Sequence, residues 1–227
     1  MPIYDLLFDV REYGALADNS TDDTNAINET IDAAAAIGGG TVILAVGTHI
    51  VSNNVVVKKK VTLMGHGLHS IIKLADNSTL TNAGIIRVKD TTQSDYACLR
   101  NFAIDGNKAN NSTVTNKHGV YSEANYLTLK NLYVHDCPAY GINLHEINSG
   151  SGTYSEYLLI MNNLVVDCGN SSYDNFVLDF VRYSTVSGNL NKGSGRHGIN
   201  ITTKSRYNTI NNNVIVSAAI NGITLQS

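Results

Sequence analysis

The segment AYGINLHEIN, residues 139–148, places Tyr140, Asn143 and His145 within six positions of alternating apolar residues. Histidine exchanges a proton near neutral pH, and tyrosine and asparagine donate hydrogen bonds, so these side chains could handle a polar ligand. The same residue types on one strand could also form a solvated rim without any chemistry. The two interpretations differ in which side chains the neighbouring segments place beside this one.

Five segments of similar pattern recur and predict those neighbours. They are GVYSE, GINLH, NFVLD, GINIT and GITLQ, beginning at residues 119, 141, 175, 198 and 222. A second kind of segment alternates with them, commonly with asparagine at a turn, as in LTLKNLYV and NTINNNVIV. A period of about 23 residues with two or three short strands is typical of a right-handed parallel β-helix, whose coils bury one another's apolar faces. A leucine-rich repeat is the rival solenoid, but its LxxLxLxxN spacing is missing.

The residues before the repeats predict a cap. In NSTDDTNAINETIDAAAAIGGG, residues 19–40, apolar residues at helical spacing follow the capping candidates Ser20, Thr21 and Asp22, and the run Gly38–Gly40 ends the helix. The segment TVILAVGTHIVS then predicts a strand, a turn and a strand. We expect an all-β protein with a capping α-helix, a single domain over residues 1–227, with the cap over about 1–50 and stacked coils over about 51–227. The last coil stops in mid-strand, so we expect a truncated C-terminal end or self-association through the open coil.

Aligning the five segments on their first residues predicts columns of side chains, because stacked strands lie about 4.8 Å apart and successive side chains alternate. Ile142 and Leu144 should face the core. The outward columns are Tyr121, Asn143, Val177, Asn200 and Thr224; Glu123, His145, Asp179, Thr202 and Gln226; and, before the strands, His118, Tyr140, Asp174, His197 and Asn221, with Lys117 and Arg196 one step earlier. One face thus carries histidines, carboxylates, a tyrosine and cations, which a site needs and a purely solvated face more often lacks. Asparagines at successive turns could form amide ladders.

Composition disfavours several classes of function. The net charge of -3 gives no global attraction for nucleic acid or an anionic membrane. The first residues lack the apolar run of a signal peptide. Cys98, Cys137 and Cys168 form no CxxC and are interpreted as buried small hydrophobes rather than disulfides or zinc ligands. GHG and GGG do not open a phosphate-binding helix after a strand, and we expect no organic cofactor.

Four segments carry a family resemblance: FAIDGNKAN, YGINLHE, NFVLDF and RHGINITT, in this order. Together they resemble the catalytic A-module of secreted bacterial mannuronan C5-epimerases, which act on alginate, within the pectate-lyase-like β-helix superfamily. The resemblance implies that Tyr140, His145 and Asp179 are catalytic. Asn143 stands where the family motif has a catalytic aspartate. The residues expected to contact the substrate are Lys117, His118, Arg196, His197 and Asn200.

The implied reaction removes the C5 proton of a mannuronate residue and returns a proton to the other face, giving guluronate. The sequence does not decide whether His145 or Tyr140 is the base. Asn143 cannot ionise, which leaves three outcomes: epimerisation, β-elimination by a lyase, or binding without turnover, as in a tailspike-like module. Hydrolysis of the pectin type needs paired carboxylates, and the residue series of polygalacturonases is absent. The resemblance also implies an extracellular protein with an acidic polysaccharide as partner and a structural Ca²⁺, for which Asp22, Asp23, Asp105 and Asp174 are possible ligands.

Overall fold

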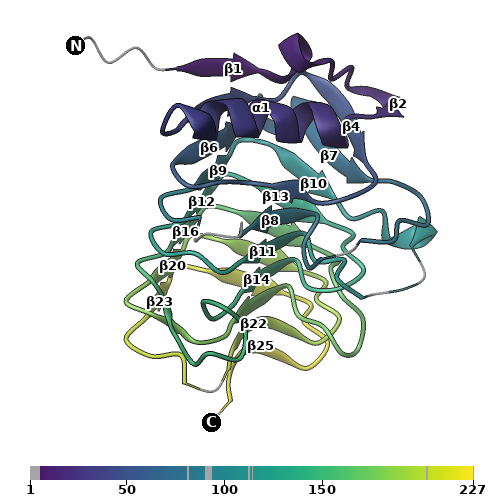
Figure 1. Cartoon of the computed structure of the whole chain (residues 1–227). Coiled ribbons are helices and arrows are strands. Elements are labelled where there is room, and N and C mark those ends of the chain that lie inside the picture. The colour runs from purple at the N-terminus through teal and green to yellow at the C-terminus, as the bar shows by residue number, and fades with distance from the viewer. Residues whose placement is uncertain are drawn as a thin grey trace.

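The computed structural model describes residues 6–80, 82–89, 94–111, 113, 115–202 and 204–226, which form stacked coils beneath one helix (Figure 1). Each complete coil contributes one strand to each of three parallel sheets. This is the parallel β-helix that the repeat period predicts. The ends of the predicted cap and coils, residues 1–5 and 227, lie outside the described residues.

The strands follow in chain order within each sheet. The first sheet holds β1 (Leu7–Asp9), β3 (Gly40–Ile43), β6 (Val61–Met64), β9 (Cys98–Arg100), β12 (Thr128–Lys130), β16 (Leu159–Met161), β20 (Thr185–Ser187) and β23 (Thr209–Asn211). The second holds β2 (Asp18–Asp22), β4 (Gly47–Val51), β7 (Ser70–Leu74), β10 (Ala103–Asp105), β13 (Tyr133–His135), β17 (Leu164–Val166), β21 (Leu190–Lys192) and β24 (Val214–Val216). The third holds β5 (Val55–Val56), β8 (Ile86–Val88), β11 (Val120–Ser122), β14 (Ile142–Leu144), β18 (Phe176–Leu178), β22 (His197–Ile201) and β25 (Asn221–Leu225).

The pairing register of the third sheet confirms the predicted columns. Asn143 pairs with Tyr121 on one side and with Val177 on the other, and Val177 pairs with Asn200. Ile142 and Leu144 are fully buried in the apolar core between the sheets. The alternation of side chains therefore places the core and the polar face as the sequence predicts.

Asparagines shape the turns between the first and second sheets. Asn131, Asn162 and Asn212 have φ of 54°, 57° and 52°, a left-handed conformation that asparagine tolerates better than most residues. The predicted amide ladder is also present: the Asn163 side-chain amide donates to Asn189 Oδ1 at 3.0 Å, and Asn189 donates to Asn213 Oδ1 at 2.9 Å. The turns are thus locked from coil to coil by buried amides.

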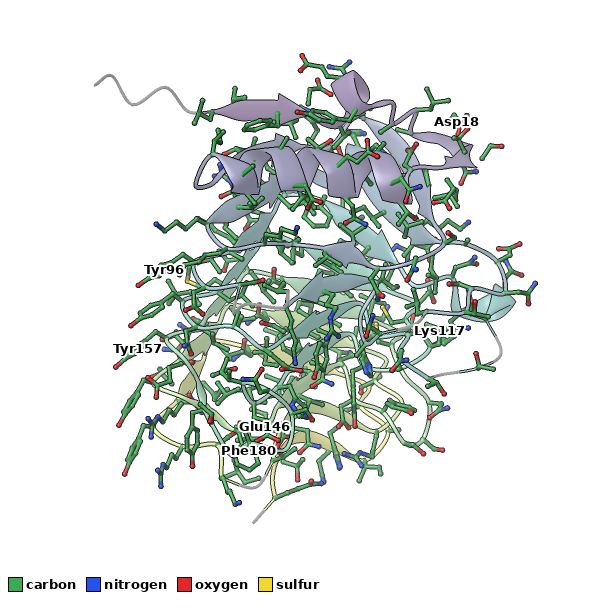
Figure 2. The ribbon with its side chains drawn as sticks, viewed as in Figure 1. Asp18, Tyr96, Lys117, Glu146, Tyr157 and Phe180 are labelled. Carbon is green, nitrogen blue, oxygen red and sulfur yellow. The ribbon has the colours of Figure 1, made fainter. Side chains whose placement is uncertain are left out.

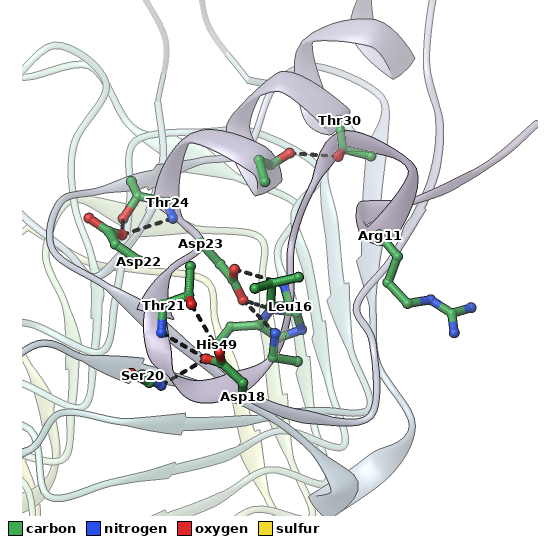
Figure 3. Close-up of polar contacts among 12 residues, drawn as sticks. Arg11, Leu16, Asp18, Ser20, Thr21, Asp22, Asp23, Thr24, Thr30 and His49 are labelled. Atoms are coloured by element: carbon green, nitrogen blue, oxygen red, sulfur yellow. Dashed lines mark hydrogen bonds and ion pairs between the residues drawn. The ribbon is translucent and has the colours of Figure 1, made fainter.

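The helix α1 (Thr24–Ala36) covers the N-terminal end of the stack and packs Ile27 and Ile31 onto it (Figure 1). Figure 3 shows how its start is held: the Asp22 carboxylate accepts the backbone N–H of Thr24, and Asp23 accepts two backbone N–H groups and contacts His49 Nδ1 at 2.6 Å. Asp23 occupies the N-cap position, and of the three predicted capping candidates Asp22 contacts the helix start, whereas Ser20 and Thr21 were wrong because both bind Asp18 instead. The helix ends before Gly38, as predicted.

Smaller elements complete the fold. Three short 3-10 helices, η1 (Val10–Tyr13), η2 (Gly67–His69) and η3 (Lys108–Asn110), lie in connections, and β15 (Ser155–Glu156) pairs with β19 (Val181–Arg182) outside the three sheets. The cysteines are free; Cys137 and Cys168 are buried, as predicted, whereas Cys98 is half-buried. Within the described part of the chain, no helix has the length and apolar character needed to cross a membrane.

Candidate active site

The outer face of the third sheet brings the predicted site residues together, but it is less exposed than a solvated sheet face would be. Asn143 keeps 6% exposure, Val177 4% and Asn200 1%, although all three point away from the core. These short side chains lie between the columns that precede and follow the strands, which carry longer side chains. The outward alternation is therefore confirmed, and the face is a partly enclosed surface.

His145 and Asp179 lie side by side in successive coils, directly after β14 and β18. His145 Nε2 is 3.3 Å from Asp179 Oδ2, and Thr202 Oγ1 donates to Asp179 Oδ1 at 2.5 Å. The backbone supports this arrangement, because the Asp179 N–H donates to the Leu144 carbonyl oxygen. Asp179 can thus orient the imidazole and stabilise its protonated form.

Aromatic rings connect His145 to Tyr140 across the face. The His118 ring lies 5.2 Å from the Tyr140 ring and 6.0 Å from the Tyr121 ring, and Tyr121 lies 5.7 Å from His145. Tyr173, which the sequence did not single out, packs edge-on against Tyr140 at 4.9 Å. The histidine and the tyrosine implied to be catalytic therefore belong to one continuous cluster.

The titration of this cluster is set mainly by burial. Burial, with the neighbouring His145, lowers the pKa of His118 to about 4, so His118 is neutral at pH 7. Burial raises the pKa of Tyr140, and the Asp174 carboxylate raises it further, so the phenol keeps its proton at neutral pH. Neutral Tyr140 can therefore donate a hydrogen bond or a proton, which a phenolate could not.

Asp174 holds three of the predicted substrate-contacting residues. It is fully buried, and its oxygens accept from Arg196 Nε and Nη2, from the His197 backbone N–H and from Asn200 Nδ2, each at 2.9 Å. These four donors leave the carboxylate little capacity for a metal ion. Asp174 therefore positions Arg196, His197 and Asn200. Its place in the predicted column between Tyr140 and His197 could have suggested this role.

Lys117 is buried, and its ammonium donates to Thr113 Oγ1 at 2.8 Å. Burial lowers its pKa. Its backbone carbonyl accepts from Ala139, which anchors it beside the coil of Tyr140. Figure 2 labels Lys117 at the edge of the stack. The sequence-predicted contact with substrate requires the ammonium to leave Thr113.

Among the described residues, several polar atoms of the face are buried without a hydrogen-bond partner. They are Nδ1 of His118, His145 and His197 and the side-chain oxygens of Asn143 and Asn200. A buried polar atom without a partner is costly, and a concentration of such atoms on one face indicates a polar ligand. These five atoms belong to predicted site residues.

The possible calcium ligands do not come together. Asp22 and Asp23 bind the start of α1, and Asp174 binds Arg196. Asp105 lies near His135 and Asp136, with ligand atoms within 4.8 Å of one another, at the C-terminal ends of β10 and β13. An imidazole fits Ca²⁺ poorly, since calcium prefers six to eight oxygen ligands. This group is not a preformed calcium site.

Comparison with known proteins agrees with the resemblance drawn from the sequence. Residues 7–224 match the family model described as rhamnogalacturonase A/epimerase, pectate lyase-like. Mannuronan C5-epimerase AlgE2 of Azotobacter vinelandii is 29% identical over 96% of this chain, and alginate lyase 7 of the same organism is 31% identical over 87%. The solved A-module of Azotobacter vinelandii AlgE6 superposes with a TM-score of 0.85 at 28% identity, over 95% of this chain.

The matches cover only part of each relative. The chain spans 22% of AlgE2, 24% of alginate lyase 7 and 58% of the solved AlgE6 module. The similarity therefore concerns the β-helix that this chain shares with part of each longer relative.

Proposed function

Because the chain belongs to the rhamnogalacturonase A/epimerase family of pectate lyase-like proteins, we propose that it converts β-D-mannuronate residues of alginate to α-L-guluronate. The observation that carries the proposal is the pair His145–Asp179, on the same face as Tyr140 and Asn143. The similarity to mannuronan C5-epimerases over nearly the whole chain supports the choice of substrate.

His145 is assigned as the base and Tyr140 as the acid. The C5 proton of a uronate lies next to a carboxylate, and its removal leaves a carbanion whose charge spreads onto the carboxylate oxygens. When His145 takes this proton, Asp179 at 3.3 Å stabilises the imidazolium. Tyr140 is protonated at neutral pH, since its pKa is raised, and can return a proton to the opposite face. This division of roles goes beyond the sequence, which left both assignments open.

The developing charge on the substrate carboxylate needs donors and cations. Asn143 offers an amide that donates without first taking up a proton. Arg196 supplies positive charge from a neighbouring coil, and so does Lys117 once its ammonium leaves Thr113. Arg196 is held by Asp174, which fixes the direction of the guanidinium. His118, His197 and Asn200 line the same face and provide further hydrogen bonds to sugar hydroxyls.

The alternative reaction is β-elimination, which uses the same carbanion. In that case the carbanion expels the oxygen at C4 and leaves an unsaturated sugar. The similarity to alginate lyase 7 is the observation in its favour. Binding without turnover is the third outcome, and the experiment below distinguishes all three.

The test incubates the protein with polymannuronate in D₂O and records proton NMR spectra together with the ultraviolet absorbance of unsaturated ends. Guluronate signals with deuterium at C5 and no new absorbance would establish the epimerase. Growing absorbance would establish the lyase. His145→Gln should abolish either activity, and His135→Gln, a histidine on the second sheet, is the matched control that should not. If the native chain is silent, Asn143→Asp tests whether the asparagine is the cause.

The proposal includes an extracellular location, because a polymer of ionised carboxylates does not cross a lipid bilayer unaided. A structural Ca²⁺ is part of the proposal only as an added ligand, since no three carboxylates of the described residues come together without a histidine. A thermal melt with and without Ca²⁺ or a chelator tests it: a rise in Tm with calcium supports the ion, and equal melts exclude it as a structural component. Culture fractionation tests the location.

A further inference from the structure

A cationic and aromatic cluster lies beside the candidate active site, on the turns that follow the third sheet. Its members are Tyr154, Phe180, Arg182, Tyr183, Lys204, Arg206 and Tyr207. Phe180 directly follows Asp179, and Lys204 comes two residues after Thr202 (Figure 2 labels Phe180). Ser155, the neighbour of Tyr154, donates from its hydroxyl to the His145 carbonyl oxygen at 2.5 Å. The cluster therefore follows the active-site residues closely along the chain in three successive coils.

Two arginines lie next to each other in this cluster. Arg182 and Arg206 form a parallel bridge between adjacent coils, and their guanidinium carbons lie 4.4 and 5.0 Å from the centre of the same Tyr154 ring. Like charges in adjacent strands repel each other. The Tyr154 ring face relieves part of this repulsion, because it attracts cations.

The cluster carries more positive charge than its carboxylate can neutralise. Glu156 pairs with Arg182. Lys204 contacts the Phe180 ring at 4.7 Å, and Arg206 contacts the Tyr207 ring at 5.6 Å as well as Tyr154. Among the ion pairs of the described residues, none includes Lys204 or Arg206. Two exposed cations on aromatic faces are thus left to bind an external anion.

The exposed ring edges add a second component. Tyr183 and Tyr207 belong to a stack of tyrosines that, among the described residues, comprises Tyr96, Tyr126, Tyr157, Tyr183 and Tyr207, with neighbouring ring centres 4.6 to 5.7 Å apart. Their exposed fractions are 46% for Tyr183 and 68% for Tyr207. Aromatic surfaces pack against the C–H groups of sugars, and guanidinium groups bind carboxylates. A sugar that carries a carboxylate satisfies both.

We propose that Lys204 and Arg206, with the rings beside them, bind carboxylates of the uronate residues next to the one held at His145. This inference rests on the proposed polyuronate substrate. One polymer chain can contact both places, because the cluster begins one residue after Asp179 and in the coils of β18 and β22. The cluster would increase affinity for longer polyuronates and take no part in the proton transfers.

The test measures binding of hexamannuronate by calorimetry at low and moderate salt. The double variant Lys204→Gln/Arg206→Gln should bind it about tenfold more weakly, the size expected for two exposed ion pairs, and with a weaker salt dependence. The double variant Lys130→Gln/Lys192→Gln removes two exposed lysines from the first and second sheets and should bind as the native chain does. Lys204→Arg/Arg206→Lys keeps both charges and should retain the affinity.

Several results would overturn the inference. They are native affinity in Lys204→Gln/Arg206→Gln, an equal loss in the matched control, or an equal loss for uncharged mannohexaose. Circular dichroism melts of each variant show whether a lost affinity reflects lost folding; in that case the charge-preserving variant decides, and its failure to bind also overturns the inference. If the native chain binds no hexamannuronate, the proposed function fails too; if it binds and the variants do not differ, only this inference fails.

Discussion

Replacing Asp174 with asparagine separates the positioning of the site from its chemistry. Asp174 touches no reacting group in the proposed mechanism, yet it accepts four hydrogen bonds, two of them from Arg196. Asparagine has the same shape but offers one acceptor oxygen, and its amide group would face donors. We expect Arg196 and Asn200 to lose their fixed positions.

The expected losses of stability and turnover in Asp174→Asn follow from the contacts of Asp174. Removing one partner of a buried ion pair costs about 3–5 kcal/mol. The Arg196 side chain keeps 25% exposure, so water can solvate part of the freed guanidinium. We therefore expect the free energy of unfolding to fall by the lower end of that range, about 3 kcal/mol. Misplacing a substrate-contacting group by about 1 Å can cost roughly 10²-fold in rate, which is the expected loss in turnover of polymannuronate.

Two assays are needed. Urea unfolding followed by circular dichroism gives the stability, and deuterium incorporation at C5 gives kcat and KM of the folded protein. Asp174→Glu, which keeps the charge, should recover part of both the stability and the turnover. Asp136→Asn, directly after β13 of the second sheet, is the control for loss of a carboxylate. A folded Asp174→Asn protein with native kcat and KM would refute the positioning role, even if its stability had fallen.

Three other changes test the site and the scaffold. Asp179→Asn should lower kcat by about 10²-fold, the contribution typical of acid–base catalysis, because the imidazolium of His145 loses its carboxylate; turnover within twofold of the native value would contradict this. The pKa of His118 is about 4 in the folded chain against 6.5 unfolded, so its stability contribution is present above pH 6.5 and is lost as the pH falls towards 4. Between pH 6.5 and 4 the free energy of unfolding of the native chain should fall by up to about 3 kcal/mol more than that of His118→Gln. The same pH dependence of the free energy of unfolding in both proteins, measured by urea unfolding, would contradict this. Asn189→Ala should cost about 2–3 kcal/mol, because buried donors of Asn163 lose their acceptor, and an unchanged urea midpoint would exclude a stabilising ladder.

The repeat made much of this fold predictable from the sequence. Once GINLH and NFVLD are aligned on their first residues, alternation fixes which side chains face the core, and coil stacking fixes the columns. His145 and Asp179 therefore could be placed side by side without coordinates. The helix was predicted for the same reason, because Ile27, Ile31 and Ala34 recur at helical spacing and Gly38 stops it.

The parts that could not be predicted depend on the directions of turn side chains. Ser20 and Thr21 are good capping residues by type, but their backbone extends into β2 and the helix begins four residues after Ser20. The low exposure of Asn143, Val177 and Asn200 could not be predicted, since the pattern does not show how far the flanking side chains cover the outward face. Arg182 and Arg206 fall in different segments, and only the stacking of the coils reveals that they share the Tyr154 ring.

The asparagine at 143 can be understood from the charges already present on this face. Glu123, Asp174 and Asp179 lie in neighbouring coils, and Lys89 and Arg196 pair with the first two. In the proposed function a substrate carboxylate enters beside these anions, so a further ionised side chain at 143 would oppose it by like-charge repulsion. An aspartate there would have to hold a proton before it could donate a hydrogen bond. Asn143 donates without that proton, and its buried oxygen, which has no partner among the described residues, could accept a hydroxyl of the proposed substrate.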